Sequence, residues 1–269
     1  MMRMDLHIHT EHSFDCESSI AAIVRKSEED GLDLIAICDH ETLSAVTLAR
    51  DYSERVQVIA ASEINTEQGI HIVGLFLKDE IHSRHLLDVI DEIHSQKGLA
   101  LLPHPFRKGK GLLYLKEESR GDITEITAEA LSKIDLIELA TPRCRPEEII
   151  RTHEFLKTHS DIPQVAASDA HTLDEIGRAY LELDIEKTEN EKELKAALLT
   201  APRLLRFEIY RDEGTWEAPV SRQQNIKSDL IRRTGQLISE PIRKTVGNIY
   251  RKSSELISRK KETGKKTTL

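Results

Sequence analysis

The segment Asp5-Leu-His-Ile-His-Thr10 joins an apolar run to two closely spaced histidines near the start of the chain. The apolar residues favour a buried strand at residues 4–8. Because residues i and i+2 of a strand point the same way, His7 and His9 can present their rings to one site. The segment therefore predicts a first strand that ends in a metal-binding or catalytic site.

Outward from this segment, apolar runs alternate with amphipathic stretches as far as about residue 210. The expected strands are residues 4–8, 32–38, 56–61, 70–77, 99–102, 136–139, 164–167 and 204–209. The expected helices are residues 19–30, 43–54, 83–96, 127–133, 146–159 and 189–199. Runs that are buried on both faces and alternate with helices indicate parallel strands with helical crossovers. Seven or eight such units in this length favour an α/β barrel over an open sheet.

Polar residues stand at the ends of other expected strands as well. They are His40 after residues 32–38, Glu63 after 56–61, His71 at the start of 70–77, His104 after 99–102, and Asp169 and His171 after 164–167. In a parallel barrel the carboxyl ends of the strands share one rim, so these side chains should converge. His71 alone, or Asp39-His40 as a helix cap, also fits a plain surface role, but that explanation would have to hold at five strand ends.

The residue types in this set suit a metal cluster. Imidazole and carboxylate ligands together bind Zn²⁺, Mn²⁺ or Fe²⁺. Six histidines and several carboxylates exceed the three or four ligands that one ion takes from a protein, so two or three divalent ions are expected. The other six histidines fall in expected helices or loops and are interpreted as solvated or structural: His12, His82, His85, His94, His153 and His159.

The composition is that of a folded chain. Of 269 residues, 39% are hydrophobic and 32% are charged, which excludes a largely disordered protein. No run approaches the ~18 apolar residues of a membrane helix, and the polar, histidine-rich N-terminus is unlike a secretory signal. The three cysteines, Cys16, Cys38 and Cys144, cannot all pair because their number is odd, and they include no CxxC pair. A disulfide framework is therefore disfavoured. A cytoplasmic location is expected.

Charge divides the chain into an acidic body and a basic tail. Residues 220–269 hold 13 Lys and Arg against 4 Asp and Glu, so this segment carries +9 and the rest of the chain −18. We expect one domain at residues 1–215 and a tail of basic amphipathic helices at residues 216–269. Three roles for the tail stay open: docking on its own domain or a twin subunit, contact with RNA or another polyanion, and binding at a membrane surface.

The motifs, taken as an ordered set, resemble the polymerase and histidinol phosphatase (PHP) family. They are Asp5-Leu-His7-Ile-His9-Thr10, Ser13-Phe-Asp15, Asp39-His40, Glu63, His104-Pro105 and Ser168-Asp169-Ala-His171, and they span about residues 4–185. The resemblance implies a distorted (β/α)7 TIM-like barrel of the PHP type with a trinuclear site. The ligand sets that it implies are His7, His9, Glu63 and Asp169 for one ion, Glu63, His71 and His104 for a second, and Asp15, His40 and His171 for a third.

The resemblance also implies a metal-dependent phosphoesterase, in which activated water attacks phosphorus. Arg107 is the first candidate for a phosphate contact and Arg143 the second, because a planar guanidinium can bind two oxygens. Each could instead be a surface arginine. Asp169 or His171 is expected to protonate the leaving group.

Two further carboxylates are expected to support the site. Asp39 would orient a ligand histidine, unless it caps the following helix. Glu138 would act in the same way or contact the substrate.

The substrate is not settled by these motifs. The segments around His71 and His104 look most like the branch that acts on nucleoside 3′,5′-bisphosphates and RNA 5′ ends. Members of that branch carry a helical insertion that has no clear equivalent here, so we expect a phosphate monoester of a nucleotide or another small metabolite. The alternatives are a 5′-3′ exoribonuclease or 3′,5′-bisphosphate nucleotidase, a histidinol-phosphate phosphatase, and a non-enzymatic metal-bound module of a larger assembly.

Overall fold

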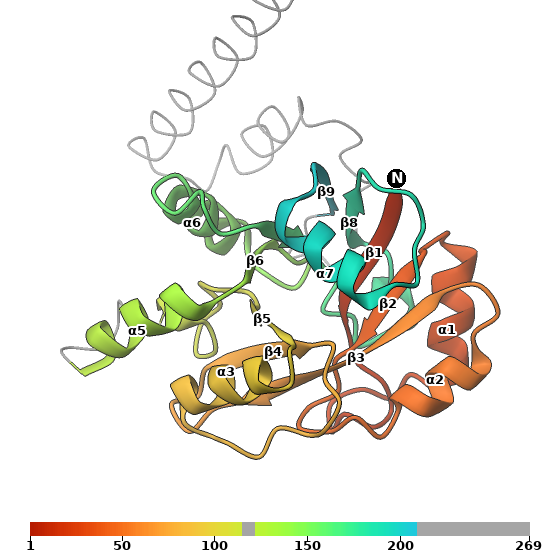
Figure 1. The fold of residues 1–269 in the computed structure, drawn as a ribbon, viewed down its shortest axis with the longest axis horizontal. Coiled ribbons are helices and arrows are strands. Elements are labelled where there is room, and N and C mark those ends of the chain that lie inside the picture. Colours follow the sequence, from red (N-terminus) through yellow and green to blue (C-terminus); the bar gives the residue numbers. More distant parts are fainter. Residues whose placement is uncertain (115–121, 209–269) are drawn as a thin grey trace, which may run out of the picture. The chain divides into compact units, whose positions relative to one another are not determined.

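The computed structural model describes residues 1–114 and 122–208 (Figure 1). The predicted basic helical tail at residues 216–269 lies outside the described residues, so it and the predicted boundary before residue 216 stay predictions. Among the residues that the structure describes, no helix is both long and apolar enough to cross a membrane.

A single mixed sheet forms the centre of the described residues. Its strands run in the order β7-β6-β5-β4-β3-β2-β1-β8-β9. They are β1 (Met2–Ile8), β2 (Leu34–Ile37), β3 (Gln57–Asn65), β4 (His71–Leu75), β5 (Leu99–Leu102), β6 (Leu136–Ala140), β7 (Gln164–Ala166), β8 (Ala179–Leu183) and β9 (Arg203–Phe207). Because β7 also contacts β8 and β9, the sheet curves into a nearly closed barrel. The predicted barrel fold is confirmed.

Helices connect most of the strands (Figure 1). They are α1 (Ile20–Glu29), α2 (Val46–Tyr52), α3 (Leu86–Ser95), α5 (Asp122–Lys133), α6 (Pro146–Leu156) and α7 (Glu191–Thr200), with a 3-10 turn η1 (Leu173–Glu175). Pro146 opens α6, where its missing N–H costs no helical hydrogen bond. Asn190 caps α7 by accepting hydrogen bonds from the backbone N–H groups of Lys192 and Glu193.

One strand direction differs from the prediction. The strands β1-β2-β3 pair in parallel, and so do β5-β6-β7, but β4 is antiparallel to both β3 and β5. The chain between β3 and β4 is a short turn in which Gly69 has a positive φ of 75°. A parallel neighbour needs a crossover of about a dozen residues, so this connection allows only a hairpin. The expectation of parallel strands throughout is therefore wrong at β4, and the antiparallel pairs of β8 with β1 and β9 depart from it as well.

The strand β8 was not predicted. It pairs antiparallel with β1 and with β9. Its sequence alternates apolar residues with Tyr180 and Glu182, so it lacks the continuous apolar run of the central strands. Glu182 is buried because Arg206 donates to its carboxylate at 2.9 and 3.1 Å.

Alternate residues of the strands form two apolar layers, as the two faces of a sheet require. One layer contains Met4 and Leu34 and packs against Leu194 and Leu198 of α7. The other contains Ile35 and Ile37 of β2 and packs against α1 and α2. This core fixes the strand ends, where the polar residues converge.

Candidate metal centre

The nine residues expected to hold metal lie together in the structure. Their ligand atoms form three groups within which all atoms lie no more than 4.8 Å apart. The groups are His7, His9, Glu63 and Asp169 (group one), Glu63, His71 and His104 (group two), and His9, Asp15, His40 and His171 (group three). Because Glu63 and His9 each belong to two groups, the three form one continuous site.

The ends of the strands bring these residues to one rim. His7 lies in β1, and Glu63 lies in β3. His71 is the first residue of β4, so the reversed direction of this strand places it beside the last residues of β3. His104 and Asp169 follow β5 and β7 with positive φ angles of 30° and 52°. Such backbone strain in non-glycine residues is concentrated at functional sites.

Group one directs four acceptor atoms at one point. The Nδ1 atom of His7 lies 2.8 Å from Glu138 Oε1, and that of His9 lies 3.0 Å from Ser13 Oγ. With the ring protons on these Nδ1 atoms, the two Nε2 atoms present lone pairs to each other at 3.1 Å. They also face oxygens of Glu63 and Asp169 at 3.3 to 3.6 Å. A positive charge among them, either a ring proton or a cation, satisfies all four atoms.

Group two shares the Glu63 carboxylate with group one. Glu63 Oε1 lies 2.6 Å from His71 Nδ1 and 3.1 Å from His104 Nε2. The other oxygen, Oε2, faces His9 at 3.3 Å. One carboxylate whose two oxygens point to different groups suits a bridge between two cations. The buried Nδ1 of His104 has no hydrogen-bond partner among the described residues.

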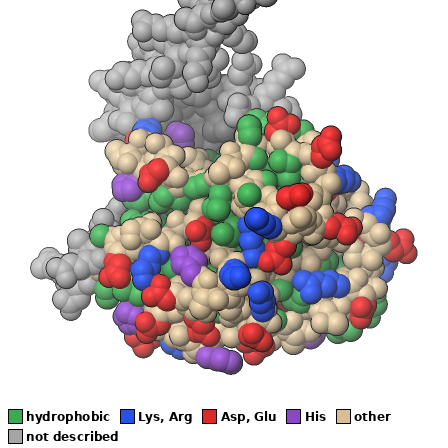
Figure 2. Space-filling view, in the orientation of Figure 1, with side chains coloured by type: hydrophobic (Ala, Val, Ile, Leu, Met, Phe, Trp, Pro, Cys, Tyr) green, Lys and Arg blue, Asp and Glu red, His purple; other side chains and the backbone are tan. Residues whose placement is uncertain are grey.

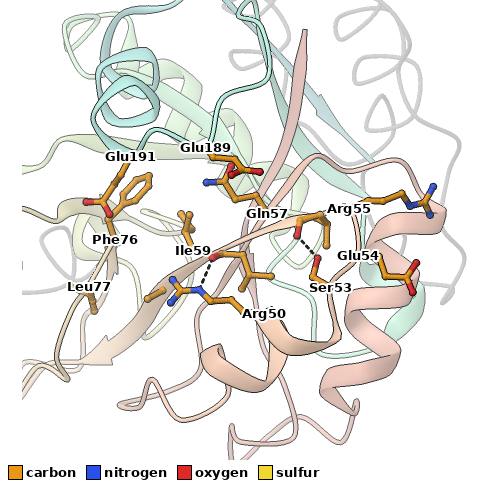
Figure 3. A pocket seen from close by; sticks show the side chains of 13 residues that line it. Arg50, Ser53, Glu54, Arg55, Gln57, Ile59, Phe76, Leu77, Glu189 and Glu191 are labelled. Atoms are coloured by element: carbon orange, nitrogen blue, oxygen red, sulfur yellow. Dashed lines mark hydrogen bonds between the residues drawn. The ribbon is translucent and has the colours of Figure 1, made fainter.

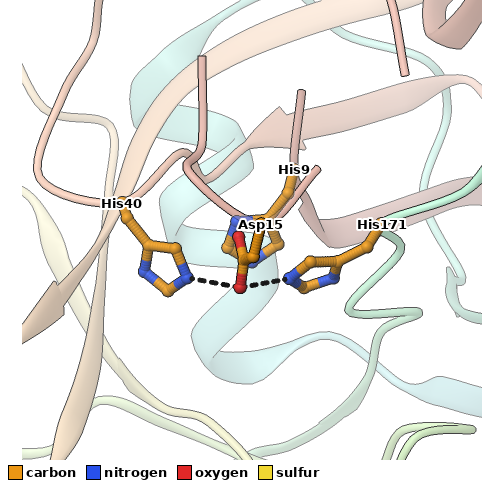
Figure 4. Close-up of side chains that lie close together, drawn as sticks. All are labelled: His9, Asp15, His40 and His171. Atoms are coloured by element: carbon orange, nitrogen blue, oxygen red, sulfur yellow. Dashed lines mark hydrogen bonds and ion pairs between the residues drawn. The ribbon is translucent and has the colours of Figure 1, made fainter. Parts of the chain in front are cut away.

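Group three lies at the more open side of the site. Figure 4 shows the Asp15 carboxylate between the rings of His40 and His171. Its Oδ2 atom lies 3.4 Å from His40 Nε2 and 3.2 Å from His171 Nε2. The Asp15 side chain is 38% exposed, whereas the ligand atoms of group one are buried. Solvent and substrate can therefore reach the site from this side.

The electrostatics of the site favour cations. Burial opposes ionisation of Glu63 and Asp169, but the neighbouring histidines outweigh it and hold the pKa of both carboxyls well below the usual range. Burial also lowers the pKa of His9, yet Asp169 and Glu63 raise it to a net value of about 9. The carboxylates thus attract positive charge to the His9 ring, which either a ring proton or a bound cation would supply. The same buried negative charge, with imidazole and carboxylate donors, fits divalent cations of the Zn²⁺, Mn²⁺ or Fe²⁺ type.

Known proteins are similar to this chain in sequence or in fold. A family model described as PHP-associated matches residues 152–201. An uncharacterized protein of Methanocaldococcus jannaschii is 30% identical over 198 residues, which cover 70% of this chain and 75% of that protein. A two-domain protein from Bacteroides vulgatus, described as containing a predicted PHP-like metal-dependent phosphoesterase, has a TM-score of 0.63 at 18% identity. That match covers 77% of this chain and 64% of the other. The chain belongs to the PHP family of metal-dependent phosphoesterases.

A shorter match concerns a relative with a named activity. A 5′-3′ exoribonuclease of Haemophilus influenzae is 35% identical over 78 residues, which are 27% of this chain and 28% of that protein.

Two carboxylates around the PHP site hold its histidines in place. Glu138 is fully buried, and its Oε1 accepts from the His7 ring while its Oε2 accepts from the backbone N–H of His104 at 2.9 Å. Asp39 accepts from the backbone N–H of Thr10 at 2.6 Å and from Ser13 Oγ at 2.8 Å. Asp39 therefore acts on the loop after β1 and does not cap α2. This geometry agrees with the expected positioning role of both residues.

The sequence assigned no role in the site to two residues of this loop, although Ser13 belongs to one of the quoted motifs. Ser13 Oγ joins the His9 ring to Asp39 and also accepts from the backbone N–H of His40 at 3.1 Å. The Cys16 thiol lies 3.4 Å from the carbonyl of His9 and 3.1 Å from that of His171. A hydroxyl at i+4 from a ligand histidine was the available signal for Ser13, but nothing in the sequence indicates the long-range contact of Cys16.

The two candidate arginines of the PHP site meet at Asp169. Arg107 donates from Nη1 to Asp169 Oδ2 at 2.7 Å. Arg143 Nε lies 4.0 Å from the same oxygen, and its Nη1 atom donates to Glu175 at 3.1 Å. Both side chains are 29% exposed, so each keeps access to solvent beside the site.

A hollow in the surface lies away from the PHP site. Figure 3 shows it, with a volume of about 600 Å³ and a lining that includes Arg50, Gln57, Phe76 and Glu189. Gln57 begins β3, and Phe76 follows β4, so the hollow lies at the opposite ends of the two strands that carry Glu63 and His71. None of its lining residues belongs to a ligand group found in the described part of the chain.

Proposed function

We propose that this protein hydrolyses a phosphate monoester with metal-activated water at a site of two or three divalent ions. The observation that carries this proposal is the convergence of nine candidate ligand residues in three overlapping groups. Two arginines, Arg107 and Arg143, lie near the same carboxylate oxygen of Asp169. Divalent cations in these groups would supply Lewis acidity and activated water for attack at phosphorus. Mn²⁺, Zn²⁺ and Fe²⁺ all suit the donor set.

The residues of the chain would hold the substrate and move its protons. Arg107 and Arg143 would bind phosphoryl oxygens, since their guanidinium groups lie beside the ligand groups and partly face solvent. Asp169 and His171 are proposed for proton transfer to the leaving oxygen. They join groups one and three, with Asp169 Oδ1 lying 3.7 Å from His171 Nδ1.

A nucleotide or another small phosphorylated metabolite is the proposed substrate, and RNA is a second candidate. The partial match to an exoribonuclease supports the nucleic-acid alternative. On the face seen in Figure 2, acidic and basic side chains are interspersed, so this face offers no broad basic surface to a long polyanion. The three cysteines are free and buried, which supports the proposed cytoplasmic location.

The test is phosphate release in excess Mn²⁺ from one panel: a nucleoside 3′,5′-bisphosphate, mononucleotides, histidinol phosphate and an aryl phosphate. Metal content of the same preparation is measured by mass spectrometry. Preferred hydrolysis of one member supports the proposal and names the substrate class. Metal-loaded protein that releases no phosphate from any member would favour the non-enzymatic module.

A further inference from the structure

Phe14 is the most exposed large hydrophobic residue in the described part of the chain. Its side chain is 87% exposed, whereas the other exposed large hydrophobic residues range from 36 to 55%. A ring in this position does not pack in the hydrophobic core, and it exposes its apolar surface to water. Its place in the loop between His9 and Asp15 puts this apolar surface at the metal centre.

The loop holds Phe14 in a fixed position. The residue before it, Ser13, is buried and bonds to the ring of His9 and to Asp39. The residue after it, Asp15, bonds to His171 in group three. The exposed ring therefore stands on a backbone that is anchored on both sides.

One face of the Phe14 ring contacts another aromatic ring of the site. It stacks on His40, with ring centroids 4.8 Å apart and an angle of 22° between the planes. His40 in turn faces Asp15 and Glu63 through its two ring nitrogens at 3.4 and 3.5 Å. The other face of the Phe14 ring is exposed beside the open side of group three.

We propose that Phe14 is a stacking platform that selects phosphate esters with a planar aromatic group, such as a nucleobase. This inference rests on the proposed phosphoesterase function. Because Phe14 is next to the ligand residue Asp15 and stacks on the ligand residue His40, a nucleotide with its phosphoryl group in the metal centre would have its base near this ring. Base stacking on an aromatic side chain is sequence-tolerant, because every base has a π face.

The test uses two ligands that differ only in the base, adenosine 5′-monophosphate and ribose 5-phosphate, with the full chain loaded with Mn²⁺. Phe14→Leu keeps an apolar side chain without the ring, and Phe14→Tyr keeps the ring. We expect Phe14→Leu to lower the preference for the nucleotide in kcat/KM by at least about fivefold, through KM, and Phe14→Tyr to preserve it. Tyr52→Leu, which removes an exposed aromatic residue of α2, should leave the preference unchanged.

Three results would overturn the inference. They are a wild-type chain without preference for the nucleotide, a Phe14→Leu chain with unchanged preference, and an equal loss on both ligands. The last result, with reduced metal content, would mean that the ring only holds His40. If wild-type protein hydrolyses neither ligand, the phosphoesterase proposal fails for them, and titration calorimetry of the same ligands still decides the role of Phe14.

Discussion

His9 takes part in two of the three ligand groups, so its loss should affect the whole site. Its Nε2 atom lies 3.3 Å from Glu63 and 3.4 Å from Asp169, and its ring centroid lies 4.2 Å from that of His171. We expect His9→Ala to reduce phosphate release by more than about 100-fold, beyond the typical cost of losing an outer partner of a ligand. Bound metal should fall in parallel, while circular dichroism stays unchanged.

The matched control for His9→Ala lies on the same loop. His12 is exposed, and its ring bonds to Ser44 at 2.6 Å without joining any ligand group. His12→Ala should keep both activity and metal content. Full activity in His9→Ala would contradict the assignment of the metal centre.

Glu138 tests the role of a residue that positions ligands without belonging to a ligand group. A glutamine in its place has only one oxygen, so it cannot accept from both the His7 ring and the His104 N–H. We expect Glu138→Gln to weaken metal affinity by about 10- to 100-fold, measured by metal titration. Glu182→Gln, a buried glutamate paired with Arg206, should leave metal affinity unchanged, and equal losses in both variants would argue for a general destabilisation.

Arg107 tests phosphate recognition. Arg107→Lys keeps the charge near Asp169 but loses the planar fork that can bind two phosphoryl oxygens. We expect KM to rise by about tenfold, with metal content unchanged, because one charged hydrogen bond is lost. Arg55→Lys, at a side chain that is 72% exposed, serves as the control. An unchanged KM in Arg107→Lys would remove this residue from the phosphate site.

At the level of residues, the sequence predicted which side chains meet because their types recur at strand ends. The contacts of Glu138 with two different strand ends join residues that lie 34 and 131 positions apart in the chain. Such distances depend on the curvature of the whole sheet, which no local pattern records. The ion-pair partner of Arg107 could not be predicted for the same reason.

At the level of elements, short apolar runs were recognised where both faces are buried, as in β2 and β5. The direction of β4 was not predicted, because an apolar run has the same pattern in either direction. The five residues between β3 and β4 carried the missing information, since they are too few for a crossover. The partly polar strand β8 lacked the pattern altogether.

The strand β8 supports β1, which carries His7, so its packing should affect stability without touching the chemistry. Leu181 is fully buried in the layer that contains Met4, and the two residues are paired across β1 and β8. We expect Leu181→Ala to lower the free energy of unfolding by about 2 to 5 kcal/mol, measured by urea denaturation. Activity per folded molecule should be unchanged at temperatures where the variant stays folded.

The half-exposed Leu199 of α7 provides the comparison for Leu181. Leu199→Ala should change the unfolding free energy by no more than about 0.5 kcal/mol. A loss of activity in folded Leu181→Ala would mean that β8 shapes the site directly.

At the level of the whole molecule, all nine ligand residues and both arginines lie between positions 7 and 171. The last described strand ends at Phe207. We therefore expect a chain without residues 222–269 to keep kcat/KM for a mononucleotide within about threefold of the full chain. Its affinity for a single-stranded oligoribonucleotide should fall and depend less steeply on salt if the tail binds RNA, because the removed segment is strongly basic.

A truncated chain that unfolds at the same urea concentration but no longer hydrolyses the mononucleotide would show that the tail completes the site. An unchanged salt dependence would instead leave docking on its own domain, a twin subunit or an anionic membrane as the roles to test.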